Sequence, residues 1–438
     1  SGRRPLFLVL PEVEQIARHL EKVRGVERVC VAGSLRRCKE TIGDGDILVA
    51  SSHPVPVIEA FTNMAGVARV LAKGDTKASV TLASGMDVDL RVVPLQSWGA
   101  ALNYFTGSKE HNVALRKIAI AKGWKLNEYG LYSRRALSAK RKATREWKMI
   151  AGRTEEEVYG KLGLAYIEPE VREMTGELDA AKRQATGDKR QGLPKLIAYG
   201  SLKGDLQTQT TWTDGANTIE EMATAAMAHG LEYIAITDHS QRLKMAHGLT
   251  AERLREQGKE IDTLNAKFKD QNSKFRILKG IECDILKDGS LDLPDDALAG
   301  LDVVGVSVHS HFNLSRDEQT SRIMRAMENP HADILFHPTG RILGRRDAYE
   351  VDMKAIITAA KRTGTVLEIN SLERLDLRDE HVRMAVEAGV KLAINSDAHT
   401  KEHFAALEIG ISQARRGWAE KRDVINAWPL EKMLASLK

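Results

Sequence analysis

The chain has 438 residues and a mass of 48.5 kDa, a length that suggests about three folding units at roughly 150 residues each. Hydrophobic residues make up 42% and charged residues 29%, a globular composition that argues against wholesale disorder. No apolar run reaches the ~18 residues of a membrane span, three cysteines exclude a disulfide framework, and a formal charge of +5 does not by itself indicate nucleic acid. We therefore expect a cytoplasmic protein without a membrane partner.

The first half of the chain is predicted to mix helices and short strands. Residues 11–25 carry the apolar spacing of an amphipathic helix. Strand-like runs follow at 28–32, 46–50, 78–82 and 88–93, and helical patterns dominate between 98 and 122. The stretch 170–192 is charged and lacks apolar periodicity past Val171, so we interpret it as a linker and place a domain boundary near residues 193–194.

The second half has a regular alternation of strand-like and helical patterns. Apolar runs occur at 231–236, 275–278, 303–308, 334–336, 366–369 and 392–394. Helical patterns such as 219–228 and 355–362 lie between them. This alternation predicts a parallel sheet, either open or closed into a barrel.

Basic residues gather between positions 109 and 148, with few acids among them. They are Lys109, Arg116, Lys117, Lys122, Lys125, Arg134, Arg135, Lys140, Arg141, Lys142, Arg145 and Lys148. Such clustering indicates a surface that faces phosphate, and a solvated helix face is the alternative on charge alone.

A pair of acids enters the second strand-like run. Asp44 and Asp46 are two residues apart, so in an extended segment their carboxylates point to the same face. Two such carboxylates can hold divalent cations, which in turn can bind a triphosphate. A calcium loop is excluded because Leu48 and Ala50 occupy the next ligand positions and cannot coordinate through their side chains. A structural turn with surface acids remains the alternative for this pair taken alone.

Upstream of the acids, the segment 33–37 has residues suited to an anion. Gly33 and Ser34 open a helical turn whose backbone N–H groups and hydroxyl can meet phosphate, and Arg36 and Arg37 add positive charge. Gly-Ser followed by Asp-x-Asp entering a strand resembles the nucleotidyltransferase superfamily. That superfamily has a third carboxylate on a neighbouring strand, and the matching residue is Asp89 in the run Asp-Leu-Arg-Val-Val.

A second motif narrows the resemblance. Residues 104–108 read Tyr-Phe-Thr-Gly-Ser, which is similar to the nucleotide pocket of family X DNA polymerases. Glycine after an aromatic pair lets the backbone approach a sugar closely, and Asn112 and Arg116 are four residues apart on the helix that follows. Core packing of the two aromatic residues is the alternative when the motif is considered without the upstream acids.

The resemblance to family X implies specific roles, expected over residues 1 to about 170. Asp44, Asp46 and Asp89 are expected to bind two Mg²⁺ or Mn²⁺ ions and to carry the chemistry. Expected nucleotide-binding residues are Gly33, Ser34, Arg37, Gly43, Tyr104, Phe105, Gly107 and Asn112, and expected DNA-binding residues are Lys109, Arg116 and Lys117. Family members carry a lyase-like helix-hairpin-helix region ahead of the palm, and this sequence is expected to lack it.

Histidines and acids recur at the ends of the apolar runs in the second half. Catalytic and metal-binding groups of a β/α barrel gather at the carboxyl ends of its strands, and imidazole with carboxylate suits Mn²⁺, Zn²⁺ or Fe²⁺. Runs such as 237–240, 307–310, 337–341 and 395–399 are similar to the PHP phosphoesterase domain, which bacterial family X polymerases carry at the C-terminus. The ligands that this resemblance implies are Asp214, His239, Glu282, His309, His337, Asp397 and His399.

One motif departs from the PHP pattern. The family's first motif is Gly-Asp-Leu-His-x-His, whereas residues 204–209 place glutamine, Gln207 and Gln209, at both histidine positions. An amide oxygen is a weaker ligand for transition metals than imidazole and cannot act as a base. We therefore expect fewer metal ions than in the family and a weakened nuclease.

The expected fold is an α+β polymerase palm and thumb of nucleotidyltransferase type, followed by an α/β PHP-type distorted (β/α)7 barrel. Expected boundaries are 1–96 for the palm, 97–170 for the thumb, 171–194 for the linker and 195–438 for the PHP domain. The expected function is DNA synthesis from dNTPs on gapped or primer–template DNA, by a monomer, with Mn²⁺ or Zn²⁺ in the barrel.

Three alternatives remain open. The first is a phosphatase or 3′–5′ exonuclease that works from the barrel alone, an interpretation that the two glutamines disfavour. A non-catalytic module that binds DNA ends is disfavoured by the intact aspartates. Nucleotidyl transfer to RNA or a small molecule is disfavoured by the motif at 104–108 with Asn112 and Arg116.

Overall fold

The computed structural model describes residues 2–135, 146–188 and 192–438. It divides into two compact units, Ser1–Pro194 and Lys195–Lys438. Within the described residues, every helix is too short or too polar to cross a membrane. The expected basic residues Lys140, Arg141, Lys142 and Arg145 lie outside the described residues.

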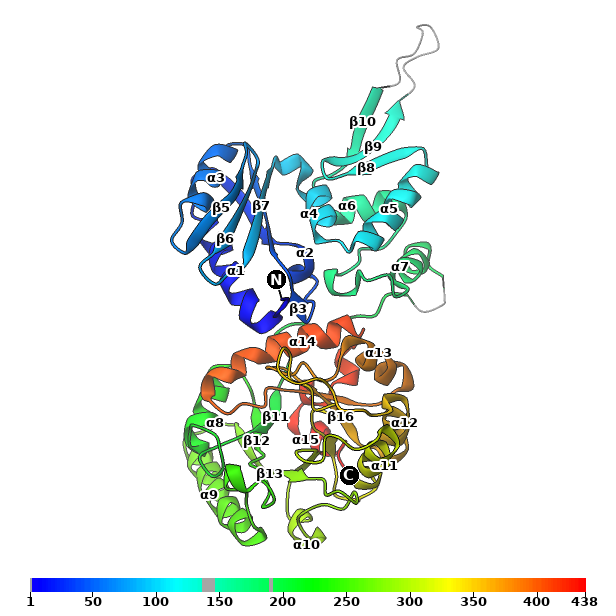
Figure 1. The fold of residues 1–438 in the computed structure, drawn as a ribbon. Coiled ribbons are helices and arrows are strands. Elements are labelled where there is room, and N and C mark those ends of the chain that lie inside the picture. The colour runs from blue at the N-terminus through cyan, green and yellow to red at the C-terminus, as the bar shows by residue number, and fades with distance from the viewer. Residues whose placement is uncertain (1, 136–145, 189–191) are drawn as a thin grey trace. The chain divides into compact units, whose positions relative to one another are not determined.

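A five-stranded sheet forms the first part of unit one, with strand order β2-β4-β7-β6-β5 (Figure 1). The strands are β2 (Val26–Val31), β4 (Gly45–Ser51), β5 (Val67–Lys73), β6 (Lys77–Leu82) and β7 (Asp87–Val93). Helices α1 (Leu6–Leu20) and α3 (Pro54–Thr62) contact this sheet, a short α2 (Gly33–Arg36) follows β2, and β1 (Arg4–Pro5) pairs with β3 (Thr41–Ile42). The central strands β4 and β7 run parallel to each other.

Burial explains which of these elements the sequence reveals. Four consecutive residues of β4, from Ile47 to Ala50, are buried, so the strand appears as a continuous apolar run. The edge strand β5 has no buried residue and no apolar alternation, and the sequence analysis missed it. Helix α1 begins at Leu6 rather than at residue 11, because its buried stripe already includes Leu6 and Val9.

A three-stranded antiparallel sheet forms the second part of unit one. Its order is β10-β9-β8, with β8 (Trp124–Asn127), β9 (Gly130–Arg135) and β10 (Glu146–Ala151). Helices α4 (Trp98–Thr106), α5 (Lys109–Ala121) and α6 (Glu155–Leu162) lie beside it (Figure 1). The helical stretch predicted for 98–122 is thus two helices, which are separated at Gly107 and Ser108.

The segment interpreted as a linker contains a packed helix. Helix α7 (Glu177–Thr186) buries Glu177, Ala180 and Ala181 against unit one. Small alanines and one buried acid leave no apolar periodicity, so the sequence pattern hid this helix.

Unit two is a sheet of seven parallel strands in the order of the chain, surrounded by helices (Figure 1). The strands are β11 (Gly204–Thr208), β12 (Tyr233–Ile236), β13 (Arg276–Asp284), β14 (Val303–Ser307), β15 (Ile334–Leu335), β16 (Val366–Asn370) and β17 (Leu392–Asn395). The helices are α8 (Ile219–Ala228), α9 (Ala251–Asp270), α10 (Asp295–Leu298), α11 (Arg316–Met327), α12 (Met353–Thr363), α13 (Asp379–Ala388), α14 (Leu407–Arg416) and α15 (Leu430–Leu434). A bridge from Thr208 to Ala398, just beyond β17, brings the first strand beside the last and nearly closes a barrel.

Side chains of alternate residues fill the two sides of the barrel wall. Tyr233 and Ala235 belong to the inner cluster, whereas Ile234 and Ile236 pack in the cluster that includes the surrounding helices. Both faces are therefore apolar, which is why the strands appear in the sequence as continuous runs. Gly305 is required inside because a Cβ there would lie 1.9 Å from the Phe336 ring.

Candidate functional site

Two carboxylates meet across the parallel pair at the centre of the first sheet. Asp46 in β4 lies opposite Asp89 in β7, and the hydroxyl of Ser79 in β6 donates a hydrogen bond to Asp89. Both acids are half-buried, whereas Asp44 precedes β4 and is exposed. The shared face expected for Asp44 and Asp46 assumed that both are extended, but Asp44 belongs to the turn before β4. The carboxylate placed beside Asp46 by sheet register is that of Asp89.

The pKa of Asp46 reflects its burial and the two acids beside it. Burial, with further repulsion from Asp44 and Asp89, raises the pKa of Asp46 to about 7, although Arg37 and Lys77 oppose the shift. A divalent cation among these oxygens would relieve that repulsion. The donor set is carboxylate oxygen alone, which suits Mg²⁺ or Mn²⁺, and so these residues fit the expected metals.

Gly33 makes room for the Asp46 carboxylate. It has φ +60°, and a Cβ built on it would lie 1.9 Å from Oδ2 of Asp46. Helix α2 starts at this glycine, directly beside the acid. A small pocket is lined here by Ala32, Asp46, Ile47, Lys77, Asp89, Leu90, Arg91 and Phe105. The backbone turn, the acids and the aromatic residue therefore share one cavity.

The two arginines of the 33–37 segment are already paired. Arg36 forms two hydrogen bonds with Glu155, at 2.9 and 2.6 Å, and Glu155 also pairs with the fully buried Arg172 at 2.7 Å. Arg36 is therefore part of a buried ion-pair network, which differs from the phosphate role expected of it. Arg37 bonds Oε1 of Glu173 at 3.0 Å and the carbonyl of Thr106.

Ser34 and Gly43, two of the expected nucleotide-binding residues, lie before and after Arg36 and Arg37 in the chain. Ser34 is half-buried in α2, and Gly43 is exposed two residues ahead of β4. The structure thus brings the Gly33–Ser34 turn close to the acids.

The α4–α5 corner holds the expected nucleotide residues. Tyr104 and Phe105 form an edge-to-face pair with centroids 5.1 Å apart, and Arg91 lies 5.3 Å from the Phe105 ring centre. Nδ2 of Asn112 donates to the carbonyl of Tyr104 at 2.7 Å, while its Oδ1 is buried without a hydrogen-bond partner. Gly107 ends α4 with φ +72°.

Helix α5 also presents the expected DNA-binding cations. Lys109 and Lys117 are exposed, and Arg116 is half-buried. Their common helix places positive charge on the same element as Asn112. This arrangement is consistent with both phosphate binding and a solvated helix face.

The barrel gathers its polar side chains at the carboxyl ends of its strands, around Glu282. Oε2 of this fully buried acid accepts from Nε2 of Gln207 (3.1 Å) and Nε2 of Gln209 (2.9 Å). Oε1 lies 2.8 Å from Nε2 of His337 and 3.2 Å from Nε2 of His309. Although burial opposes ionisation, the imidazoles of His239 and His309 hold the pKa of Glu282 well below its usual range.

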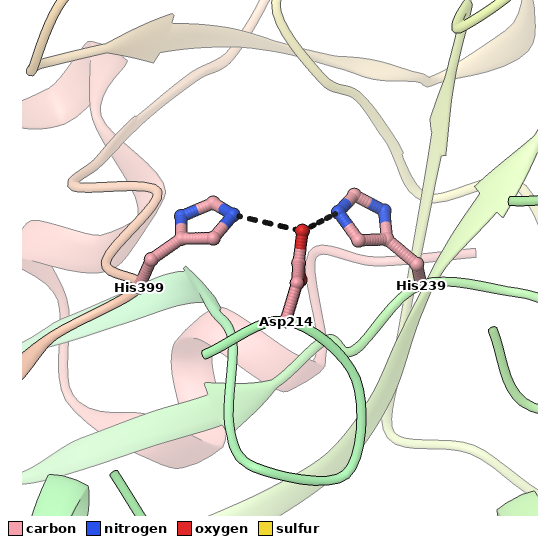
Figure 2. Close-up of side chains that lie close together, drawn as sticks. All are labelled: Asp214, His239 and His399. Carbon is pink, nitrogen blue, oxygen red and sulfur yellow. Dashed lines mark ion pairs between the residues drawn. The ribbon is translucent and has the colours of Figure 1, made fainter. Parts of the chain in front are cut away.

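A second group lies on the other side of His239. Figure 2 shows the carboxylate of Asp214 between two imidazoles, 3.5 Å from Nε2 of His239 and 3.6 Å from Nε2 of His399. Burial opposes protonation of His399, but Asp214 and Asp397 raise its pKa to about 10. Among the described residues, the sets whose ligand atoms lie within 4.8 Å of one another are Asp214, His239 and His399, and His239, Glu282 and His309.

Comparison with known proteins matches both halves of the chain. Residues 101–173 match the family model "DNA polymerase beta thumb", and residues 205–371 match the "PHP domain" model. The DNA polymerase/3′-5′ exonuclease PolX of Bacillus subtilis (strain 168) is 43% identical over 439 residues, which cover 100% of this chain and 73% of that protein. This chain belongs to the PolX family.

Further relatives match single parts of the PolX chain. A probable phosphatase of Thermoanaerobacter sp. (strain X514) is 34% identical over 235 residues, which cover 51% of this chain and 89% of that protein. A solved structure of Leishmania infantum polymerase beta in a ternary gap complex has a TM-score of 0.34 and 23% identity, over 40% of this chain and 71% of that one.

The two candidate metal sets in the barrel of this PolX chain differ in how well they fit a metal ion. Asp214, His239 and His399 offer imidazole nitrogen and carboxylate oxygen, a donor set for Mn²⁺ or Zn²⁺. His239, Glu282 and His309 offer the same kinds of donor, but the amide N–H groups of Gln207 and Gln209 occupy one oxygen of Glu282, which leaves this set fewer free ligand atoms.

Several residues that shape the two sites of this PolX chain escaped the sequence analysis. In the barrel, Asn370 donates to Asp397 at 3.1 Å, and Nε of Arg374 lies 3.6 Å from the same carboxylate. In unit one, the fully buried His111 bonds Glu177 at 2.8 Å and the Tyr159 hydroxyl at 2.8 Å. His111 directly precedes Asn112 in the recognised motif, and that position was the available signal for it.

Proposed function

We propose that this PolX chain transfers nucleotides from dNTPs to a primer 3′-hydroxyl in gap-filling DNA repair, with two divalent ions held by Asp44, Asp46 and Asp89. The observation that carries the proposal is the parallel register of Asp46 and Asp89 beside Gly33, with the raised pKa of Asp46. Such a cluster of acids is stable when a cation neutralises it. Bound Mg²⁺ or Mn²⁺ lowers the pKa of the attacking hydroxyl and stabilises the departing pyrophosphate.

The chain's own residues orient the reactants. Ser79 holds the Asp89 carboxylate through its hydrogen bond, which fixes the acid nearest the primer hydroxyl. Gly33, Ser34 and Gly43 offer backbone and hydroxyl donors for the β- and γ-phosphates. Arg37 reaches the same phosphates by exchanging its bond to Glu173 for one to the nucleotide.

The α4–α5 corner recognises the nucleotide and the DNA. Tyr104, Phe105 and Gly107 contact the sugar, and Asn112 turns its unpartnered Oδ1 towards the incoming nucleotide. Lys109, Arg116 and Lys117 contact DNA phosphates. In this proposal the palm (1–96) binds the metal ions and the phosphates, the thumb (97–170) contacts the sugar and the DNA, and the PHP domain (195–438) is a separate unit.

The test is primer extension on one-nucleotide-gapped DNA with Mg²⁺ or Mn²⁺. We expect addition of one nucleotide by the unmodified chain and none by Asp89→Ala. Failure of the unmodified chain to extend any primer–template, with its fold verified by circular dichroism, overturns the proposal.

A second activity is proposed for the barrel: a weakened metal-dependent 3′–5′ exonuclease. Hydrogen bonds from Gln207 and Gln209 to Glu282 favour the weakening, since they occupy an oxygen that could otherwise bind metal. A hydrolytic site needs metal to generate hydroxide near neutral pH. Degradation of the same primer in Mn²⁺ without nucleotides measures it, and robust degradation that His337→Ala removes would show that the remaining ligands suffice.

A further inference from the structure

One face of the thumb sheet points away from α4 and α5. Leu131, fully buried, points towards α4 and α5, which contact β8 and β9. Its neighbour Tyr132 points the opposite way, and cross-strand pairing places Lys125 and Met149 on either side of it. Arg134 pairs with Trp147 two residues farther along and shares that face. We define the outward face by Lys125, Tyr132, Arg134 and Trp147.

Aromatic rings and cations alternate on the outward face. Trp147 is 38% exposed, and the guanidinium of Arg134 lies 4.8 Å from its ring centre. Lys125 and Arg134 are exposed, and Tyr132 is half-buried between its neighbours. A partly exposed indole held by an arginine on a polar surface can offer its free ring face to a partner.

The chemistry of the outward face selects the partner. An apolar protein surface would leave Lys125 and Arg134 desolvated and unpaired, which is costly. Duplex DNA offers phosphates but keeps its bases stacked on one another. Unpaired DNA offers both a phosphate chain for the cations and free base faces for Trp147 and Tyr132, the combination that single-strand-binding proteins use.

We propose that the outward face binds the unpaired template strand of the DNA substrate by base stacking on Trp147 and Tyr132 and by phosphate contact with Arg134 and Lys125. This inference rests on the proposed polymerase function and adds a recognition surface for the single-stranded part of the substrate. Arg134 serves twice, because its stacking on Trp147 holds the indole flat while its charge meets phosphate.

The first test compares two DNA substrates by fluorescence anisotropy with the full chain. One carries a 5′ template overhang of ten nucleotides, and the other a one-nucleotide gap with no overhang. We expect Trp147→Ala to weaken binding of the overhang substrate by about 5- to 150-fold relative to the gapped one, the range for loss of one base-stacking contact. Trp147→Phe should keep most of the preference of the wild-type chain for the overhang substrate over the gapped one. Tyr132→Ala should lose this preference even though Trp147 is present.

A matched control lies in unit two. Tyr199 is 46% exposed with the Arg415 guanidinium 4.9 Å from its ring centre, so it reproduces the aromatic–arginine pair of the outward face. Tyr199→Ala should leave both affinities unchanged. An equal loss for both substrates in Trp147→Ala and in Tyr132→Ala overturns the inference, because it would indicate a general structural defect of the thumb.

The second test separates stacking from charge. Arg134→Gln should reduce the slope of log K against log salt on overhang DNA by about 0.7, the value for one phosphate contact on a single strand, while Trp147→Ala should lower affinity without changing the slope. A wild-type chain that extends gapped DNA but shows no preference for the overhang overturns this inference alone. A wild-type chain that neither binds nor extends either DNA overturns the proposed function and this inference together.

Discussion

The palm site and the barrel site of this chain are both built at neighbouring strands of a parallel arrangement, yet their charges are balanced in opposite ways. In the palm, Asp46 and Asp89 face each other, and burial with mutual repulsion raises the pKa of Asp46 to about 7. In the barrel, neighbouring imidazoles lower the pKa of the buried Glu282, and two amides also donate to it. In the palm the surroundings thus oppose ionisation of the central acid, whereas in the barrel the neighbouring donors favour it.

The largest expected effect concerns the palm. Asp89→Ala should reduce nucleotide addition by ~10²-fold or more, because it removes a group that acts in the transition state, while DNA and nucleotide binding stay largely intact. Single-turnover extension with binding measured in parallel checks this. Asp87→Ala is the matched control, since Asp87 is exposed on the same strand and its carboxylate accepts a hydrogen bond from Thr81. Near wild-type extension by Asp89→Ala would remove the assignment.

The next effect tests whether the palm acids need their glycine neighbour. Gly33→Ala should reduce extension by about 10²-fold, because the new methyl group would displace the Asp46 carboxylate and an ångström of misplacement has that cost. Gly160→Ala in α6, where a Cβ meets nothing within 4 Å, is the control and should extend normally. Equal activity of the two variants would show that Asp46 is not held in place by the turn at Gly33.

The third prediction restores histidine at the two glutamine positions of the barrel. Gln207→His with Gln209→His should add about one metal equivalent per chain and raise primer degradation in Mn²⁺, because imidazole replaces an amide that donates to Glu282. Metal content by mass spectrometry and degradation without nucleotides are the two measurements. Gln271→His, at the exposed end of α9, controls for adventitious binding. Unchanged metal content in the double variant would contradict this account of the barrel.

The smallest expected effect concerns the salt dependence of DNA binding and shows which of the two units contacts DNA phosphates. Changing Lys109, Arg116 and Lys117 together to glutamine should flatten the salt dependence of duplex binding by about 2.7, at about 0.9 for each phosphate contact. Replacing the exposed barrel residues Lys259, Lys269 and Lys274 in the same way should leave the slope unchanged. If the first triple variant keeps the wild-type slope, the cations of α5 form only a solvated face.

Much of the architecture was predictable because buried strands have a simple pattern. The predicted helix at 219–228 is α8. The runs at 231–236 and 303–308 contain β12 and β14, and those at 366–369 and 392–394 cover all but the last residue of β16 and β17. Elements with little buried apolar surface escaped: β5 has no buried residue, and α7 is packed through alanines and Glu177. Periodicity detects burial of apolar groups, and neither element has enough of it.

The sequence by itself determined the order of the two halves, the acids of the palm and the replacement of two histidines by Gln207 and Gln209, because these are matters of residue identity and spacing. Only the tertiary structure decided how the charges are distributed. It pairs Arg36 with Glu155 rather than leaving it for phosphate, and it turns both amides onto Glu282. Partners more than a hundred residues apart, such as Arg36 and Glu155, become neighbours only through packing, and an ion pair depends on distance and burial rather than on spacing along the chain.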